Sequence, residues 1–274
     1  MRGSASETRI AMNTLAEWIA LHSLLLWALL LLLALLAGDL AWRHNARWQR
    51  RAALLGQAPT MLRWRTGLLL CMVLGLFFGG LALAISGQPT TGLDGFDASL
   101  AASLRAHVPV PALRVIAAIT HLGDTLWVAS AAAVVLLILL LRRQWTLAAS
   151  WSVALLGILP INGGLKALFR RARPLHDHGF IVEPGWSFPS GHAFGAMVFY
   201  GMLAYVLLRL TPRFHRAVIA GAVLMVGVIG VSRILLQVHY LSDVMAGYAI
   251  GAAWLVLCMG TSEWLRHQPG GATP

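Results

Sequence analysis

The residues best suited to chemistry lie in a stretch from Ser232 to Asp243, which joins two apolar runs and contains an arginine, a histidine and an aspartate. If His239 and Asp243 lie on a helix, their spacing places them on one face, one turn apart. The carboxylate can then hold one imidazole nitrogen while the other attacks a phosphorus atom. The competing interpretation is that Asp243 or Ser242 only caps the last helix and that His239 is solvated at the interface.

Three basic residues in and before this stretch could bind a phosphoryl group. Lys166 is followed after six residues by Arg173 and Pro174, and Arg233 lies within the stretch itself. A phosphoryl transition state spreads negative charge over its equatorial oxygens, which fixed positive charges stabilise. The planar guanidinium also suits the binding of two oxygens at once.

A third cluster, Pro189-Ser190-Gly191-His192, stands where an apolar helix is expected to begin. Backbone N–H groups at a helix start form an anion site, and glycine permits close approach. His192 would then protonate the leaving oxygen while His239 attacks phosphorus, and general-acid help of this kind is worth about 10²–10⁴ in rate. Water would release phosphate from the phosphohistidine.

The composition is that of an integral membrane protein. Of 274 residues, 58% are hydrophobic and only 11% are charged, and apolar runs of nearly spanning length recur along the whole chain. We therefore predict an all-α polytopic bundle, since a lipid-exposed backbone must satisfy its own hydrogen bonds. The net charge of +11 is better explained by basic loops on one side of a membrane than by nucleic-acid binding. Cys71 and Cys258 are interpreted as small core residues.

Seven spans are expected, with the N-terminus outside and the C-terminus inside. They are residues 18–37, 66–86, 115–141, 145–165, 192–210, 217–236 and 244–264. We give residues 1–4 no structural weight. Arginines follow the first span, so we predict an uncleaved anchor, with cleavage near Ala37-Gly38 as the alternative. Residues 87–111 predict an external segment with a short amphipathic helix on the surface, carrying Phe96, Leu100 and Leu104.

The segment 166–191 is predicted to be irregular and to lie outside, although it is basic. Positive charges on the outer side oppose the usual accumulation of positive charge inside, which indicates that this segment has a function that requires anion binding. Within it, Arg170 and Arg171 are interpreted as contacts to lipid headgroups. His176-Asp177-His178 lacks a third ligand at a telling distance, so no metal site is predicted.

Two groups of residues keep two interpretations each. His121-Leu122-Gly123-Asp124, near the outer end of the third span, could line the pocket or make buried structural contacts. Trp186 and Phe188 could belong to an aromatic belt or to the rim of a lipid-chain site.

The patterns KxxxxxxRP, PSGH and SRxxxxxHxxxD, in this order and at helix ends, resemble the type 2 phosphatidic acid phosphatase (PAP2) superfamily. The resemblance implies hydrolysis of phosphate esters or diphosphates without a metal or other cofactor. It implies His239 as nucleophile, Asp243 as its partner and His192 as acid/base. The phosphate ligands that it implies are Lys166, Arg173, Ser190, Gly191 and Arg233.

The six-helix core of that family would cover residues 66–265, after an extension of residues 1–65 with an extra transmembrane helix and before a tail of residues 266–274. The expected substrate is a membrane lipid with a terminal phosphate, which the protein would bind at the outer face of a bacterial inner membrane. Candidates are undecaprenyl diphosphate, phosphatidylglycerol phosphate, phosphatidic acid and lipid A phosphates, with the polyprenyl diphosphate or glycerophospholipid phosphate favoured.

Alternative functions remain at this stage. A phosphotransferase could use the same site to pass the phosphoryl group to another lipid. A catalytically inactive lipid-binding relative would not need all the chemical groups that are present. A transporter is disfavoured because the spans hold few ionisable groups away from their ends. The sequence predicts no nucleic-acid partner and leaves the oligomeric state open.

Overall fold

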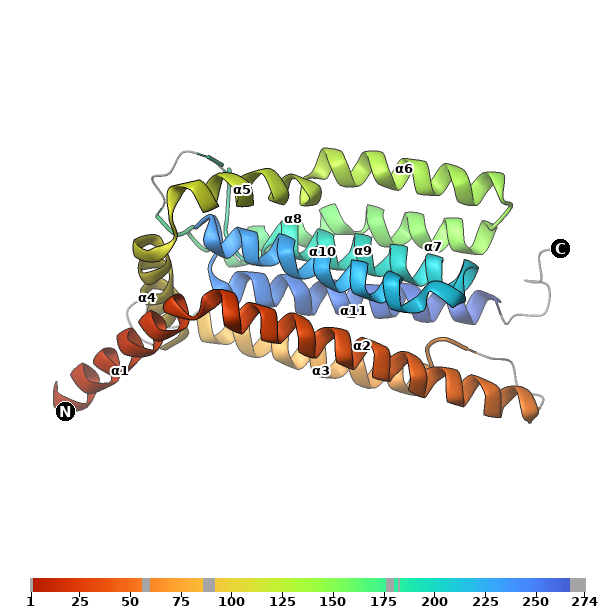
Figure 1. Ribbon diagram of the computed structural model, residues 1–274, viewed down its shortest axis with the longest axis horizontal. Helices are drawn as coiled ribbons and strands as arrows, with labels where there is room; N and C mark the ends of the chain where they lie inside the picture. The colour runs from red at the N-terminus through yellow and green to blue at the C-terminus, as the bar shows by residue number, and fades with distance from the viewer. Residues whose placement is uncertain (1, 56–59, 86–91, 176–179, 182, 267–274) are drawn as a thin grey trace.

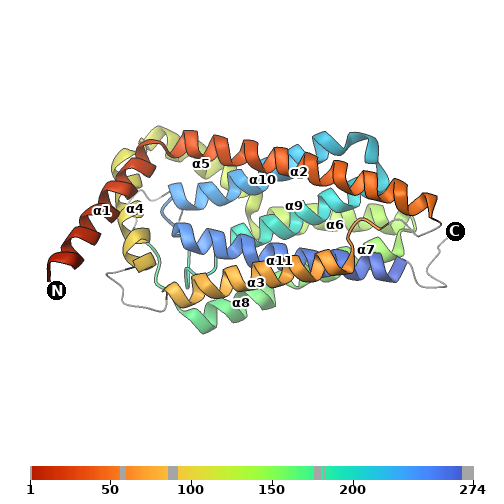
Figure 2. The same ribbon diagram turned by 90° about the horizontal axis from the view of Figure 1, so that it is seen from below.

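The computed structural model describes residues 2–55, 60–85, 92–175, 180–181 and 183–266. Every regular element in these ranges is a helix, as the all-α prediction requires. Long helices lie side by side along one axis, and α1 (Arg2–Leu21) and α4 (Gly92–His107) lie at one end of this bundle (Figures 1 and 2). The three sequence clusters lie at the same end.

Within the described residues, six helical segments are long and apolar enough to cross a membrane, or seven if a bent pair counts as one span. They are α2 (Ser23–Leu54), α3 (Trp64–Ile85), α7 (Trp145–Leu156) with α8 (Ile158–Phe169), α9 (Gly191–Leu210), η2 (Pro212–Phe214) with α10 (His215–Leu235), and α11 (Leu241–Arg266). Lys166 thus lies on α8 and not in the irregular segment that was expected to contain it.

The prediction of one continuous helix over 115–141 is wrong. The chain forms α5 (Val110–Thr120), a short 3₁₀ turn η1 (His121–Gly123) and then α6 (Thr125–Leu141). Asp124 has extended backbone angles at the start of α6. Its side chain contacts His121 and His192. An aspartate with partners outside its own helix favours a helix boundary over a helix interior.

The N-terminal prediction also needs correction. The first span begins at Ser23 and extends to Leu54, and α1 precedes it, starting within the residues that were given no structural weight. The helix expected within 87–111 is present as α4. Its apolar residues Leu100 and Leu104 are buried against Ala16 and Ala20 of α1, so another helix covers the face that was expected to lie on a surface. Of the predicted tail, only Arg266 lies within the described residues.

The central helix α9 packs against α10 and α11, and close contact with α11 depends on small residues. A Cβ at Gly247 would lie 2.6 Å from the backbone oxygen of Ser190. At Gly251 it would lie 3.1 Å from the backbone oxygen of Phe194. These two glycines of α11 let the helix carrying Asp243 lie directly against the start of α9, as the pattern of small residues predicts.

Candidate active site

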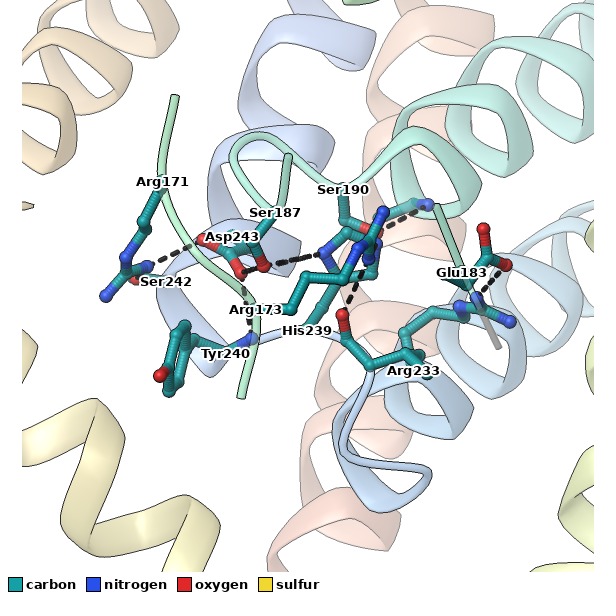
Figure 3. A network of polar contacts seen from close by, with 12 residues as sticks. Arg171, Arg173, Glu183, Ser187, Ser190, Arg233, His239, Tyr240, Ser242 and Asp243 are labelled. Carbon is teal, nitrogen blue, oxygen red and sulfur yellow. Dashed lines mark hydrogen bonds and ion pairs between the residues drawn. The ribbon is translucent and has the colours of Figure 1, made fainter. Parts of the chain in front are cut away.

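The structure brings the three sequence clusters together at one end of the bundle (Figure 3). The Arg173 guanidinium Nη1 lies 3.0 Å from His239 Nε2. The backbone N–H of Ser190 donates to the backbone oxygen of Asp243 over 2.9 Å. Lys166 lies within electrostatic reach of Arg173 and Arg233. Residues up to 77 positions apart in the sequence, from Lys166 to Asp243, therefore share one site.

His239 lies in the connection between α10 and α11, not on a helix, so the helical spacing expected for His239 and Asp243 is not what pairs them. Instead α11 begins at Leu241, and Asp243 in its first turn folds back toward the connection. Its Oδ2 accepts from the backbone N–H of Tyr240 over 2.8 Å and lies 3.5 Å from His239 Nδ1. The predicted partnership is thus present, made by a turn and a helix start.

The surroundings of His239 fix its tautomer. An arginine N–H can only donate, so the Nε2 atom facing Arg173 must carry the lone pair. The proton then resides on Nδ1, toward Asp243 and toward Ser187 Oγ at 3.3 Å. Burial lowers the pKa of His239 to about 4, against the opposing effect of Asp243. The imidazole is consequently neutral near pH 7, and its Nε2 lone pair faces Arg173, one of the phosphate-binding candidates.

Arg171 secures the other oxygen of Asp243, and its assignment to lipid headgroups is wrong. Its Nη1 donates to Asp243 Oδ1 over 2.6 Å and to Ser242 Oγ over 2.7 Å. Its Nη2 pairs with Asp97 and Asp94 of α4. Burial opposes the charge of Arg171, but Asp243 and Asp97 raise its pKa. Figure 3 shows Arg171 and His239 on opposite sides of the Asp243 carboxylate.

Arg170, next in sequence, has a different environment. It follows α8 at a positive φ of 47°. Its side chain is exposed, and its Nε donates to the backbone oxygen of Ala167. The sequence leads to the same interpretation for Arg170 and Arg171, but the two side chains make different contacts in the structure.

Arg233 is fully buried and already has an anionic partner. Its guanidinium pairs with Glu183 and donates to Thr120 Oγ1 over 3.1 Å. Burial would raise the pKa of Glu183, but the positive charges of Arg233 and His192 lower it, so the carboxylate is ionised. Sequence reasoning missed Glu183 because no motif spacing marks it.

Ser190 caps α9, with its Oγ accepting from the backbone N–H of Ala193, and this places Gly191 and His192 in the first turn as expected. His192 Nε2 lies 2.9 Å from Asp124 Oδ1, and Nδ1 lies 3.8 Å from Glu183 Oε1. Burial would raise the pKa of Asp124, but hydrogen bonds from His192 and His121 lower it. Of the two interpretations of His121 to Asp124, contact with the site is the one that Asp124 fits.

The remaining candidates are the two aromatic residues and the segment 176–178. Phe188 is buried and packs on Phe78 and Phe169, with ring centroids 5.7 and 5.0 Å away, so it belongs to neither a belt nor a rim. Trp186 is 43% exposed. Residues 176–178, for which the sequence predicts no metal site, lie outside the described residues. Among described residues, no three His, Cys, Asp or Glu side chains are grouped so as to hold a metal ion.

Comparison with known proteins identifies a family and several relatives. Residues 145–266 match the model of the PAP2 superfamily. A lipid A 1-phosphatase of Rhizobium etli is 30% identical over 185 residues, which cover 59% of this chain and 75% of that protein. The chain belongs to the PAP2 superfamily. It is a membrane-embedded enzyme of the phosphatase class, which confirms the resemblance drawn from the three motifs.

Two further relatives and one solved structure carry phosphatase names. Phosphatidylglycerophosphatase B of Bacillus subtilis is 33% identical over 113 residues, which are 39% of this chain and 54% of that protein. A lipid A 1-phosphatase of Rhizobium johnstonii is 29% identical over 236 residues, covering 78% and 84%. The crystal structure of a transmembrane PAP2 type phosphatidylglycerolphosphate phosphatase from Bacillus subtilis superposes with a TM-score of 0.66 at 26% identity, covering 73% of this chain and 98% of that one.

Proposed function

We propose that the protein hydrolyses the terminal phosphate of a membrane lipid through a phosphohistidine on His239, without a metal ion. The observation that supports this most strongly is the orientation of the His239 imidazole. Its Nε2 lone pair faces Arg173, and Nδ1 faces Asp243. A buried neutral imidazole in this tautomer is a nucleophile whose resulting positive charge Asp243 would stabilise.

The phosphate would lie among Lys166, Arg173 and Arg233, over the start of α9 at Ser190 and Gly191. Three cations and a helix N-terminus are suited to the charge that develops on the equatorial oxygens. The Glu183 carboxylate, now paired with Arg233, has the same sign as the phosphate. It would therefore give up Arg233 to the substrate.

The reaction would then proceed in two steps. His239 Nε2 forms a bond to phosphorus as the ester or anhydride P–O bond breaks, and His192 gives its proton to the departing oxygen. Water, losing a proton to His192, then attacks phosphorus and breaks the P–N bond, which releases inorganic phosphate and restores both histidines. Asp243 stays ionised throughout, held by Arg171 and Ser187.

The relatives' names favour a phosphorylated membrane lipid as substrate. They support phosphatidylglycerol phosphate and lipid A phosphates as candidates, in addition to the polyprenyl diphosphate predicted from the sequence. We propose residues 66–265 as the catalytic core, because α3 packs on α11 and the family match ends at residue 266.

We further propose that the site faces the periplasm from a bacterial inner membrane. The basic residues at the far end of the bundle support this orientation, since positive charge accumulates on the cytoplasmic side. They are Arg142, Arg143, Arg209, Arg213 and Arg266. In intact cells, a cysteine introduced near Trp186 should react with an impermeant maleimide and one near Gln144 should not. The reverse pattern would invert the orientation.

The activity is tested by phosphate release from purified protein with excess EDTA. The panel is phosphatidylglycerol phosphate, phosphatidic acid, a lipid A phosphate and undecaprenyl diphosphate. We expect undiminished release from at least one of these lipids. Complete loss with chelator, restored by a divalent metal, would contradict the proposed mechanism, and transfer of the phosphoryl group to a second lipid would make the protein a phosphotransferase.

A further inference from the structure

A cavity of about 680 Å³ lies at the end of the bundle away from the candidate active site. Its walls are the last turns of α2, the start of α3 and the last turns of α11 (Figures 1 and 2). Glu263, which lines the cavity, follows Asp243 by 20 positions on α11, and this separation corresponds to about 30 Å of helix. A helix of that length crosses the hydrocarbon of a bilayer. The cavity and the active site therefore belong to opposite leaflets.

The lining of the cavity changes from polar to apolar along the helices. Near the end of the bundle it contains two polar side chains and three tryptophan rings, namely Thr60, Arg63, Trp48, Trp64 and Trp264. Farther along α3 and α11 the lining is apolar and contains Leu68, Cys71, Val256 and Leu257. Tryptophan rings favour the boundary between headgroups and hydrocarbon. A phospholipid with its headgroup at the end of the bundle and its chains between the helices would match this order.

The charge of this region favours an anionic headgroup. Residues 43–65 contain six arginines and neither Asp nor Glu. Of these arginines, Arg63 lines the cavity, and its guanidinium carbon lies 4.7 Å from the ring centroid of Trp48. The carboxylates of Asp39 and Glu263 pair with other arginines. This leaves the charge of Arg63 without a carboxylate partner among the described residues.

Glu263 also lines the cavity, but its negative charge is already paired. Its side chain is 3% exposed, and Oε1 accepts from Arg209 Nε over 3.0 Å. The Tyr205 hydroxyl donates to the same oxygen over 2.6 Å. The second oxygen, Oε2, accepts from the backbone N–H of Met61 over 2.8 Å. This last bond ties the connection before α3, which carries Arg63, to α11.

We propose that this cavity binds an anionic glycerophospholipid of the leaflet opposite the active site, as a bound ligand and not as a substrate. The lipid phosphodiester would accept from Arg63 and from the Thr60 hydroxyl, and the acyl chains would lie against Leu68 and Leu257. Basic pockets between transmembrane helices on the cytoplasmic side bind anionic headgroups in other membrane proteins. The volume of about 680 Å³ lies within the range of ligand pockets.

Such a lipid would connect α2 to the catalytic core. Away from the cavity, α2 packs on α10, whereas α3 packs on α11. Trp48 of α2 faces the cavity together with residues of α3 and α11. The bound lipid would therefore contact both the N-terminal extension and the core. This inference does not depend on the proposed chemistry of His239.

The test uses a phosphatidylglycerol with a diazirine in one acyl chain, added to the full-length protein in phosphatidylcholine vesicles. We expect saturable label in peptides from residues 64–71 or 256–264. Arg63→Ala should raise the half-saturating mole fraction of the probe about fivefold, since one arginine at a membrane surface contributes about this factor. The matched control is Arg142→Ala, which removes an exposed arginine outside the lining and should change half-saturation less than about twofold.

A second variant fills the cavity. A Cβ at Gly260, which lines it, would meet no atom within 4 Å. Gly260→Leu should therefore raise the half-saturating mole fraction about tenfold, because the lipid loses the space of about two methylenes. The control is Gly79→Leu on α3, where a Cβ likewise meets no atom within 4 Å but the residue does not line the cavity. Its labelling should match that of wild type.

Three results would overturn the proposal. They are equal labelling of these peptides by a phosphatidylcholine diazirine, an equal effect of Arg63→Ala and Arg142→Ala, and label confined to other peptides. In each variant, kcat/KM for a water-soluble phosphate ester should stay within about twofold of wild type, because the active site lies about 30 Å away along α11. Wild-type protein that hydrolyses no phosphate ester would refute the proposed function and would leave the labelling result unaffected.

Discussion

The two histidines of the site lie in opposite kinds of environment. His239 is 2% exposed, and its carboxylate partner Asp243 is fully buried. His192 is partly exposed, and its partner Asp124 is more open still, with 40% of its side chain accessible. Behind Asp243 stands a second layer of Arg171, Ser187 and Ser242. On the far side of Asp124, the further ion-pair partner among the described residues is the exposed His121.

This difference separates a preorganised half of the site from an adaptable half. A nucleophile benefits from a fixed position and tautomer before substrate arrives, since preorganisation removes a cost from the transition state. A proton donor that must serve first the leaving oxygen and then water benefits from access to both. The contrast therefore matches the roles proposed for His239 and His192.

The largest expected effect is the loss of either histidine, and the leaving group distinguishes the two. His239→Ala should reduce hydrolysis of every substrate to background, because no phosphohistidine can form. His192→Ala should reduce kcat/KM for lipid phosphates by about 10²–10⁴, yet retain much of kcat/KM for p-nitrophenyl phosphate, because this constant reports the attack step and the nitrophenolate leaving group needs no proton. Steady-state kinetics with both substrate types measures this. Rescue of His239→Ala, and not of His192→Ala, by the nitrophenyl ester would reverse the assigned roles.

The second effect concerns the residues that hold Asp243 beside His239, the proposed nucleophile. Arg171→Ala leaves three carboxylates without their cation, and breaking a buried ion pair from one side costs about 3–5 kcal/mol. We expect a lower unfolding temperature in detergent and a kcat about 10²-fold lower, because Asp243 loses its position. The matched control is the exposed neighbour Arg170, whose replacement by alanine should keep activity within about twofold. Similar losses in the two variants would remove the distinction between them.

A smaller effect is expected on the acid/base side. Asp124→Asn keeps the size of the side chain and removes its charge, and exposed ion pairs contribute at most about 1 kcal/mol. That corresponds to roughly fivefold in kcat/KM for a lipid phosphate. Because Asp124 is proposed to position His192, kcat/KM for the nitrophenyl ester, which reports only the attack step, should stay at the wild-type value. A loss of equal size with both substrates would indicate a structural role instead.

The smallest effect is an absence of titration where a histidine normally titrates. Burial lowers the pKa of His239 to about 4, and the protonated form has no lone pair for attack. Activity should consequently be retained as pH falls through about 6.5, the usual histidine value, and be lost only near pH 4. The pH profile of kcat/KM for p-nitrophenyl phosphate in His192→Ala isolates this group. A midpoint near 6.5 in that variant would show that His239 is not buried as described.

Sequence reasoning recovered the residues whose spacing is set locally by helix ends. Ser190, Gly191 and His192 follow from a cap before an apolar run, and Arg233 and His239 from the connection between two such runs. It placed most spans within a few residues, because hydropathy over a long window reports burial in lipid. It also identified the PAP2 superfamily, since three motifs in one order leave few alternatives.

The remaining features depend on contacts that no local pattern encodes. Arg171 pairs with Asp97, a residue 74 positions away on α4, and Glu183 reaches Arg233 from an irregular segment. Hydropathy could not reveal the break before Asp124, because the flanking helices α5 and α6 are both apolar. The spacing argument predicted the contact between His239 and Asp243 but assumed that both residues lie on a helix. The contact forms because residues i and i+4 also come close when the first precedes a helix and the second lies in its first turn.

The central claim is a covalent phosphoryl group on His239, and rapid alkaline quenching of the enzyme with a ³²P-labelled lipid phosphate tests it most directly. We predict an acid-labile, alkali-stable label on the wild-type chain that maps to the peptide containing His239. Because attack precedes hydrolysis, the label should be absent from His239→Ala. A label that persists in His239→Ala, or wild-type turnover under single-turnover conditions with no labelled protein at any time, would contradict the account.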